Sequence, residues 1–131
     1  MRLGGIILAA GRSTRMGAFK PLLPLNGRPI LCGEAELFLG LGLSPVLVVA
    51  GSRREEIARA LAPYGAEVQV IRNPDSQGDM FSSVRVGAAA LPRDLDGFFC
   101  LPSDCPAVSP HTLRRLADAF QAARPPLCVP L

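Results

Sequence analysis

Lysine is almost absent from this sequence. Of the fourteen basic side chains, Lys20 is the only lysine and the others are arginines. Lysine carries a compact point charge, whereas arginine presents a planar fork of donors. We therefore expect Lys20 to lie where a small ammonium group is needed, although chance is the alternative explanation for a single exception.

Cysteine pairs at metal-binding spacing are also absent. The four cysteines, Cys32, Cys100, Cys105 and Cys128, form no C-x-x-C motif and lie mostly within apolar runs. This pattern argues against a zinc site and against a disulfide framework, and it favours small core residues. The only histidine, His111, lies near an expected helix start, and we predict that it is exposed and not catalytic.

Blocks of one charge and long apolar runs are missing as well. The formal net charge is +3, and the arginines are spread along the chain instead of alternating with aromatic residues in a basic block. This distribution argues against a nucleic-acid partner. The apolar run at residues 45–50 is far too short to cross a bilayer, and the first two residues lead directly into a strand without a signal-peptide layout. We therefore expect a cytoplasmic protein with no membrane partner.

The hydrophobic pattern predicts strands and helices in strict alternation. Strands are expected at residues 4–9, 45–50, 67–71 and 97–101, and helices at 29–39, 52–61, 80–91 and 109–120. This order predicts one α/β domain over residues 1–131, with a mostly parallel sheet between two helical layers. Ligands are then expected beyond the carboxyl ends of the strands.

Local signals refine this prediction. The strands at 45–50 and 97–101 are apolar on both faces, as buried strands are. Ser52 and Glu55 form a capping box that should open the second helix, and Asp79 should cap the third. A fifth strand is expected to begin at residues 127–129.

The first strand continues into LAAGRSTRMGAFKPLL, a loop of glycines and cations. Gly11 and Gly17 let backbone amides approach an anion without a Cβ atom in the way. Arg12, Arg15 and Lys20 add charges suited to phosphate oxygens. The loop has neither the Walker A spacing nor G-x-G-x-x-G. We predict that it binds a polyphosphate, and the alternative is a solvated loop with scattered arginines.

Two further strand-to-helix loops should open on the same edge of the sheet. After the fourth strand, Asp104 lies between two prolines, which suits a Mg²⁺ ligand that must stay ionised. The alternative is a turn aspartate that bonds its own backbone. After the third strand, three polar residues and one glycine lie around an expected helix start. They can contact a base or ribose, or they act only in capping the helix. These residues are Asn73, Gly78, Ser82 and Ser83.

The pattern LAAG-x-S-x-R-M-G-x-x-K-x-L-L resembles the signature loop of the MobA-like nucleotidyltransferases. Its LAAG form has Ala10 where guanylyl enzymes usually have a second glycine, and it is similar to the CTP:molybdopterin cytidylyltransferase branch. The segment around Asp104 also resembles the D-x-P of the family. The residues that match the signature loop are Leu8, Ala9, Ala10, Gly11, Ser13, Arg15, Met16, Gly17, Lys20, Leu22 and Leu23.

The resemblance implies a nucleotide-diphospho-sugar transferase-like fold and transfer of a cytidylyl group from CTP to a phosphorylated acceptor, molybdopterin, with pyrophosphate leaving. It implies that Asp104 holds Mg²⁺, that Arg15 grips the β- and γ-phosphates, and that Lys20 lies near the α-phosphate. No covalent intermediate is required. The nucleotide-binding residues that it implies are Leu8, Ala9, Ala10, Gly11, Arg12, Ser13, Gly17, Asn73, Gly78, Ser82 and Ser83.

Other functions remain open at this point. The chain is alternatively a nucleotide-binding remnant without turnover, a fragment of a longer enzyme, a guanylyltransferase or a sugar-nucleotide pyrophosphorylase. Relatives continue beyond the fifth strand with the strands that form the acceptor site. We therefore expect this chain to bind CTP with Mg²⁺ but to transfer the nucleotide slowly or not at all, and to self-associate through the edge of the fifth strand.

Overall fold

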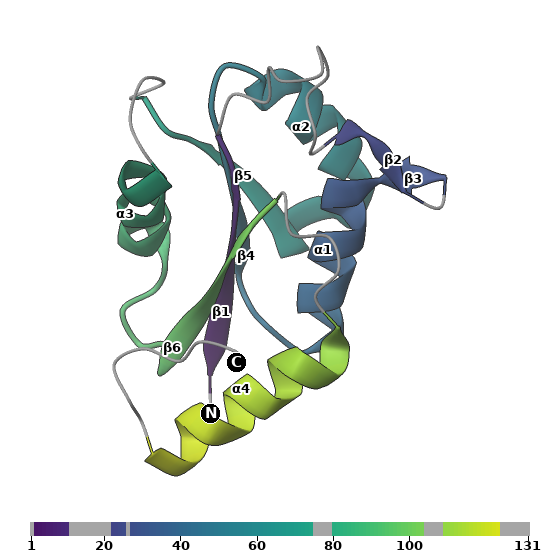
Figure 1. Cartoon of the computed structure of the whole chain (residues 1–131). Helices are drawn as coiled ribbons and strands as arrows, with labels where there is room; N and C mark the ends of the chain where they lie inside the picture. The colour runs from purple at the N-terminus through teal and green to yellow at the C-terminus, as the bar shows by residue number, and fades with distance from the viewer. Residues whose placement is uncertain (1, 11–21, 26, 75–79, 104–108, 124–131) are drawn as a thin grey trace.

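A parallel four-stranded sheet forms the centre of the computed structural model, in the order β5-β4-β1-β6 (Figure 1). The structure describes residues 2–10, 22–25, 27–74, 80–103 and 109–123. The strands of the sheet are β1 (Leu3–Ala9), β4 (Val46–Ala50), β5 (Val68–Arg72) and β6 (Gly97–Pro102). A separate antiparallel ladder pairs β2 (Pro24–Leu25) with β3 (Arg28–Pro29).

Helices alternate with these strands along the chain. They are α1 (Ile30–Gly40), α2 (Arg54–Leu61), α3 (Met80–Ala90) and α4 (Pro110–Ala123), and a 3-10 segment, Ala62–Glu67, follows α2. Gly65 interrupts that segment with a φ of +62°, a value that glycine adopts readily. The predicted alternation of four strands with four helices is thus confirmed within the described residues. The predicted strand at 127–129 and the predicted cap Asp79 lie outside them.

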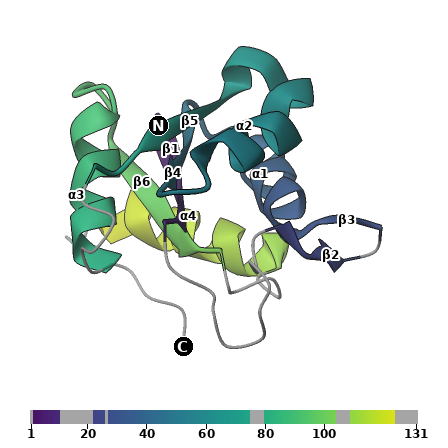
Figure 2. The same ribbon diagram turned by 90° about the horizontal axis from the view of Figure 1, so that it is seen from above.

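The helices cover both faces of the sheet, as predicted (Figures 1 and 2). On one face, Phe38 of α1, Ile57 of α2 and Leu113 of α4 belong to a single buried cluster. On the other face, Val84 of α3 packs against the cluster that contains Ile6 of β1. The sheet therefore lies between two helical layers, and its strands carry apolar side chains toward each.

Strand β4 is buried along its whole length, whereas β6 is not. All five residues of β4 are buried, which confirms the predicted central strand. The prediction of a second buried strand at 97–101 is wrong, because Phe98 is 43% exposed and Cys100 is exposed. Among the described strands β6 pairs only with β1, and α3 lies over β1 and β4 instead of β6. Cys32 is buried as predicted, but the same prediction for Cys100 is wrong for this reason.

The starts of two helices show how far a local signal is reliable. Helix α4 begins as predicted, with the Ser109 hydroxyl accepting a hydrogen bond from the Thr112 amide at 3.1 Å. The capping box predicted for α2 is wrong, because the helix begins one residue later and its cap, Arg53, makes no side-chain cap bond. Ser52 therefore precedes the cap, and the spacing to Glu55 no longer fits the motif.

A matched pair of glycine substitutions tests this packing. A Cβ atom on Gly5 of β1 would lie 2.5 Å from Cδ2 of the buried Phe38 ring, whereas one on Gly33 of α1 would meet no atom within 4 Å. Gly5→Ala should lower the free energy of unfolding by about 1–3 kcal/mol through overpacking. Gly33→Ala should raise it by up to about 1 kcal/mol, because alanine favours a helix interior. Urea denaturation measures both, and equal stability of the two variants would contradict the packing.

Candidate functional site

The order of the strands reverses at one point of the parallel sheet. From β1 the chain proceeds through β4 to β5, and it then returns through α3 to β6 on the other side of β1. The boundary between β1 and β6 is therefore the point where the strand order reverses, and ligands of open α/β sheets bind at such points. The two segments that follow β1 and β6 along the chain both start there.

Hydrogen bonds hold the carboxyl ends of β1 and β6 together at this point. The ladder continues to the pair Leu8 and Pro102, and the Ser103 amide then donates to the Leu8 carbonyl oxygen at 2.9 Å. Ser103 is only 6% exposed. The chain therefore enters the segment that contains Asp104 directly beside the end of β1.

Three of the predicted nucleotide-binding residues lie at the end of β1. Leu8 and Ala9 are the last two residues of the strand and are buried, and Ala10 follows them. A Cβ atom on Gly51 would lie 3.0 Å from the Ala10 carbonyl oxygen, so the missing side chain lets the end of β4 approach this residue. The other predicted residues of the loops lie outside the described residues. These are Gly11, Arg12, Ser13, Arg15, Gly17, Lys20, Gly78 and Asp104.

The structure brings together three of the four residues predicted to contact the nucleotide after the third strand. The Asn73 side-chain amide donates to the Ser82 hydroxyl at 2.9 Å and to the Ser83 hydroxyl at 3.0 Å. Asn73 and Ser83 are buried, at 3% and 4% exposure, and the Asn73 backbone amide bonds the Ala50 carbonyl oxygen at 2.8 Å. These bonds tie the first turn of α3 to the end of β5. They fix the two ends of the loop that contains Gly78.

Removal of the Asn73 amide should therefore destabilise the protein. Asn73→Ala deletes the donor to both serine hydroxyls and leaves the buried Ser83 hydroxyl without that partner, at a cost of about 1–3 kcal/mol. Ser82→Ala, which deletes one of these bonds at a half-buried position, should cost less than about 1.5 kcal/mol. Thermal or urea denaturation of both variants checks the ranking, and a larger loss for Ser82→Ala would contradict it.

A polar network anchors the short ladder of β2 and β3, which follows the LAAG loop in the sequence. The sequence predicted a turn at residues 26–29, and the structure adds pairing of β2 with β3 around Gly27, whose φ is +83°. Arg28 of β3 forms an ion pair with Glu36 of α1, and the Tyr64 hydroxyl donates to Oε2 of Glu36 at 2.5 Å. Burial raises the pKa of Tyr64, so its hydroxyl remains a donor.

Sequence reasoning missed this network, because Glu36 and Tyr64 are 28 positions apart and meet only in the folded chain. Neither residue belongs to a recognisable motif. The sequence indicated only the turn at residues 26–29, and a turn motif does not show which distant residues bond to it.

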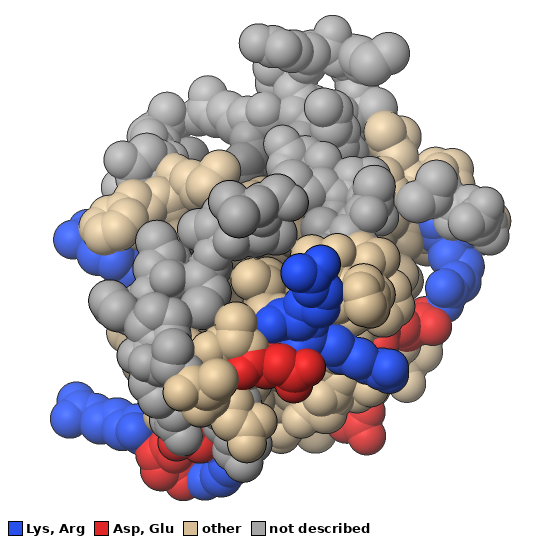
Figure 3. Space-filling model, turned by 60° about the horizontal axis from the view of Figure 1, so that its bottom comes forward, with Lys and Arg blue, Asp and Glu red and all other residues tan. Residues whose placement is uncertain are grey.

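The described residues contain no group of three or more His, Cys, Asp or Glu side chains that could hold a metal ion. The predicted ligand, Asp104, lies outside them, and His111 is exposed as predicted. Figure 3 shows basic and acidic side chains next to one another on the face that it presents. None of the described helices is both long enough and apolar enough to span a bilayer.

Comparisons with known proteins place this geometry in a family. Residues 5–131 match the model of the MobA-like NTP transferase domain. Bifunctional protein GlmU of Rhizorhabdus wittichii is 37% identical over 129 residues, which cover 96% of this chain and 28% of that protein. CMP-5'-(3-aminopropyl)phosphonate synthase of Streptomyces rubellomurinus is 35% identical over 127 residues, which cover 90% of this chain and 19% of that protein.

Solved structures agree with this result. A nucleotidyl transferase from Methanothermobacter thermautotroptrophicus superposes with a TM-score of 0.77 at 34% identity, and the match covers 89% of this chain and 57% of that one. A Mycobacterium tuberculosis protein solved in complex with manganese has a TM-score of 0.73 at 29% identity, with 93% and 61% covered. The present chain is thus much shorter than the proteins it resembles.

These likenesses confirm the predicted fold class, which is that of the nucleotide-diphospho-sugar transferases, and they confirm the resemblance carried by the LAAG loop. Since the family model spans nearly the whole sequence, the chain belongs to the MobA-like NTP transferase domain family of nucleotidyltransferases.

Proposed function

We propose that the chain binds the nucleotide donor of a cytidylyltransferase, which transfers CMP from CTP to a phosphorylated acceptor such as molybdopterin and releases pyrophosphate. The observation that carries this proposal is the pairing of β1 with β6. This pairing brings the end of β1, where the LAAG loop starts, next to Pro102 and Ser103, which precede Asp104 in the sequence, and it supports a site that combines donors for a triphosphate with a carboxylate. Because nucleoside triphosphates are cytoplasmic metabolites, the proposed reaction takes place in the cytoplasm.

Catalysis in this proposal depends on positioning and on charge. The amides around Gly11 and Gly17, with Arg15, hold the β- and γ-phosphates, and Lys20 contacts the α-phosphate as charge develops there. Asp104 is the residue that would hold a divalent ion such as Mg²⁺, for which a carboxylate oxygen is a suitable donor. When bound, that ion supplies positive charge to the phosphate oxygens.

The remaining predicted residues are assigned to the nucleoside. Ala10 follows the end of β1, and the bonded set of Asn73, Ser82 and Ser83, which flanks Gly78 in the sequence, joins the end of β5 to the first turn of α3. Leu8 and Ala9 are the buried last residues of β1, next to Ala10. Arg12 and Ser13 follow in the LAAG loop. Part of the contribution of Asn73 is to hold the two serines in place.

The choice of CTP rests on Ala10 and on one relative. The methyl group of Ala10 narrows the space beside the base relative to glycine, and the name of the Streptomyces relative contains CMP. CTP should therefore bind more tightly than GTP, by about 1–3 kcal/mol, which is the usual scale of one small steric difference. A competition titration measures the ratio directly. Displacement of CTP by equimolar GTP would overturn the choice of base.

A phosphonate is the second candidate acceptor. The Streptomyces relative is named a CMP-5'-(3-aminopropyl)phosphonate synthase, so its acceptor group differs from a phosphate ester by one oxygen atom. The test supplies each of the four ribonucleoside triphosphates with molybdopterin, with (3-aminopropyl)phosphonate and with sugar 1-phosphates, and follows the release of pyrophosphate. Release with CTP and molybdopterin alone supports the main proposal. CTP binding without release in any arm would instead indicate the non-catalytic remnant.

A further inference from the structure

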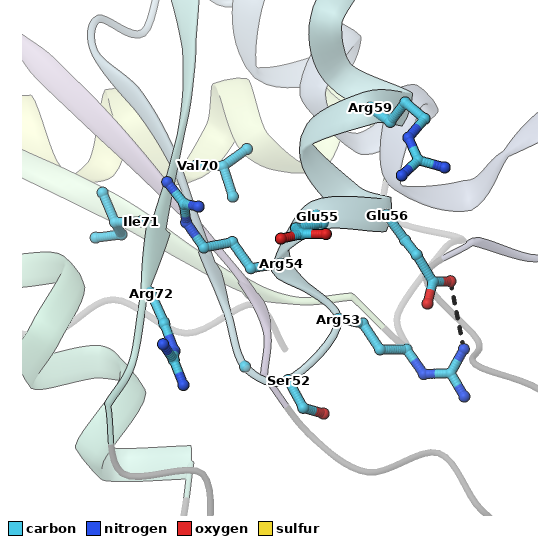
Figure 4. A pocket seen from close by; sticks show the side chains of 10 residues that line it. Ser52, Arg53, Arg54, Glu55, Glu56, Arg59, Val70, Ile71 and Arg72 are labelled. Atoms are coloured by element: carbon cyan, nitrogen blue, oxygen red, sulfur yellow. Dashed lines mark hydrogen bonds and ion pairs between the residues drawn. The ribbon is translucent and has the colours of Figure 1, made fainter.

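A polar hollow lies near the carboxyl ends of β4 and β5. It has a volume of about 890 Å³ and is formed by the turn after β4, the first two turns of α2 and the end of β5 (Figure 4). Its volume falls within the range of small-molecule sites, which is about 300–1,000 Å³, and exceeds what one inorganic anion needs. The residues that line it are Gly51, Ser52, Arg53, Arg54, Glu55, Glu56, Arg59, Val70, Ile71 and Arg72.

Arginine dominates the lining of this hollow. It contributes four guanidinium groups against two carboxylates, a formal excess of two positive charges (4 − 2). Arg53 pairs with Glu56 at 3.4 Å. In the part of the chain that the structure describes, the side chains of Arg54, Arg59 and Arg72 form no ion pair. The N–H donors of these three guanidinium groups are therefore available to an external anion.

The positions of Arg54 and Arg72 make them the main candidate ligands. Figure 4 shows the Arg54 side chain extending from α2 toward β5, where Val70 and Ile71 lie on opposite sides of the strand, and Arg72 lies at the end of the same strand. Val70 and Ile71 are half-buried, so they offer apolar surface next to the charged groups. This combination suits a small molecule that carries a phosphate on an uncharged body, because guanidinium forks match phosphate oxygens.

The hollow is separate from the proposed donor site. Strand β4 lies between β5 and β1, and neighbouring strands are about 4.8 Å apart, so the end of β5 is roughly 10 Å from the end of β1. Gly51 nevertheless lies so near Ala10 that a Cβ atom on it would be 3.0 Å from the Ala10 carbonyl oxygen, so the two sites are adjacent. We propose that the hollow binds a soluble phosphorylated small molecule next to the bound nucleotide, with Arg54 and Arg72 as its phosphate ligands.

Titration with inorganic phosphate and with glycerol 3-phosphate tests this site, followed through the backbone amide NMR signals of Ser52 and Arg72. The test variant is Arg54→Gln/Arg72→Gln, and the matched control is Arg114→Gln/Arg115→Gln, which removes the same charge from exposed positions on α4. We expect saturable shifts in the wild type and the control, and at least about tenfold weaker binding in the test variant. Equal affinity of the two variants, or shifts that never saturate, would overturn the proposal.

A second arm separates this site from the donor site and from a membrane. In the presence of saturating CTP and Mg²⁺, phosphate should still shift the Ser52 amide signal. Loss of that shift would show that the two ligands share one site and would overturn the inference. Failure of CTP to bind, with the Arg54 and Arg72 dependence intact, would refute the proposed function and leave this site standing. Binding to phosphatidic acid vesicles but not to glycerol 3-phosphate would overturn the assignment to a soluble ligand.

Discussion

Asp104→Asn is expected to reduce nucleotidyl transfer to background, a loss of about 10²- to 10³-fold or more, the scale for removing one electrostatic contact to a transition state. Asparagine keeps the shape of the side chain and removes its charge, so a divalent ion loses its proposed carboxylate ligand. The fold should be unaffected, because the chain is fixed just before this position by the bond between the Ser103 amide and the Leu8 carbonyl oxygen.

The measurement is pyrophosphate release as a function of Mg²⁺ concentration. Wild-type activity should rise with the ion, whereas the residual activity of the variant should not respond to it. Asp118→Asn is the matched control, because it makes the same chemical change at an exposed position on α4 and should leave both properties unaltered. Unchanged metal dependence in Asp104→Asn would place the ligand elsewhere.

Lys20→Ala should lower kcat by about 10²-fold or more while changing the affinity for CTP much less. The reason is the proposed contact with the α-phosphate, which strengthens only as charge develops during transfer. Lys20→Arg provides the sharper comparison. The chain uses arginine at every other basic position, so retention of full activity would show that a compact ammonium group is not needed.

Single-turnover kinetics with CTP, together with equilibrium titration of CTP, separate the two effects. A parallel fall in affinity and rate would assign Lys20 to ground-state binding of the triphosphate. Wild-type activity in Lys20→Ala would remove the residue from the mechanism. Both outcomes are distinguishable from misfolding by the thermal denaturation curve of the variant.

The sequence identified the elements of this fold because their signals are local. Residues 46–50 are apolar without a break and form the fully buried β4, and Leu31, Ala35 and Phe38 recur at helical spacing and are buried in α1. The LAAG loop is likewise a contiguous pattern, so the amino-acid sequence alone is enough to predict its family. Patterns of this kind depend only on neighbours along the chain.

The predictions that were wrong or missing concern mostly contacts between distant segments and, at the start of α2, one local motif. Cys100 lies in an apolar run, but its burial depends on whether a helix covers β6, and α3 lies over β1 and β4 instead. The capping box of α2 matched in sequence, but the turn after Gly51 delays the helix by one residue. The hydrogen bonds that Tyr64 donates to Glu36 and that Asn73 donates to Ser82 and Ser83 join segments that no local pattern relates.

The sequence by itself thus determined the alternation of strands and helices, the two helical layers and the loop that identifies the family. Only the tertiary structure decided that β6 pairs with β1 and that β4 separates β1 from β5. That order follows from which apolar faces pack together across the whole chain, and it is not encoded in any single segment. The strand order also places the ends of β1 and β6, where the LAAG loop and the Asp104 segment start, side by side. It leaves the arginine-lined hollow at the neighbouring strand ends, those of β4 and β5.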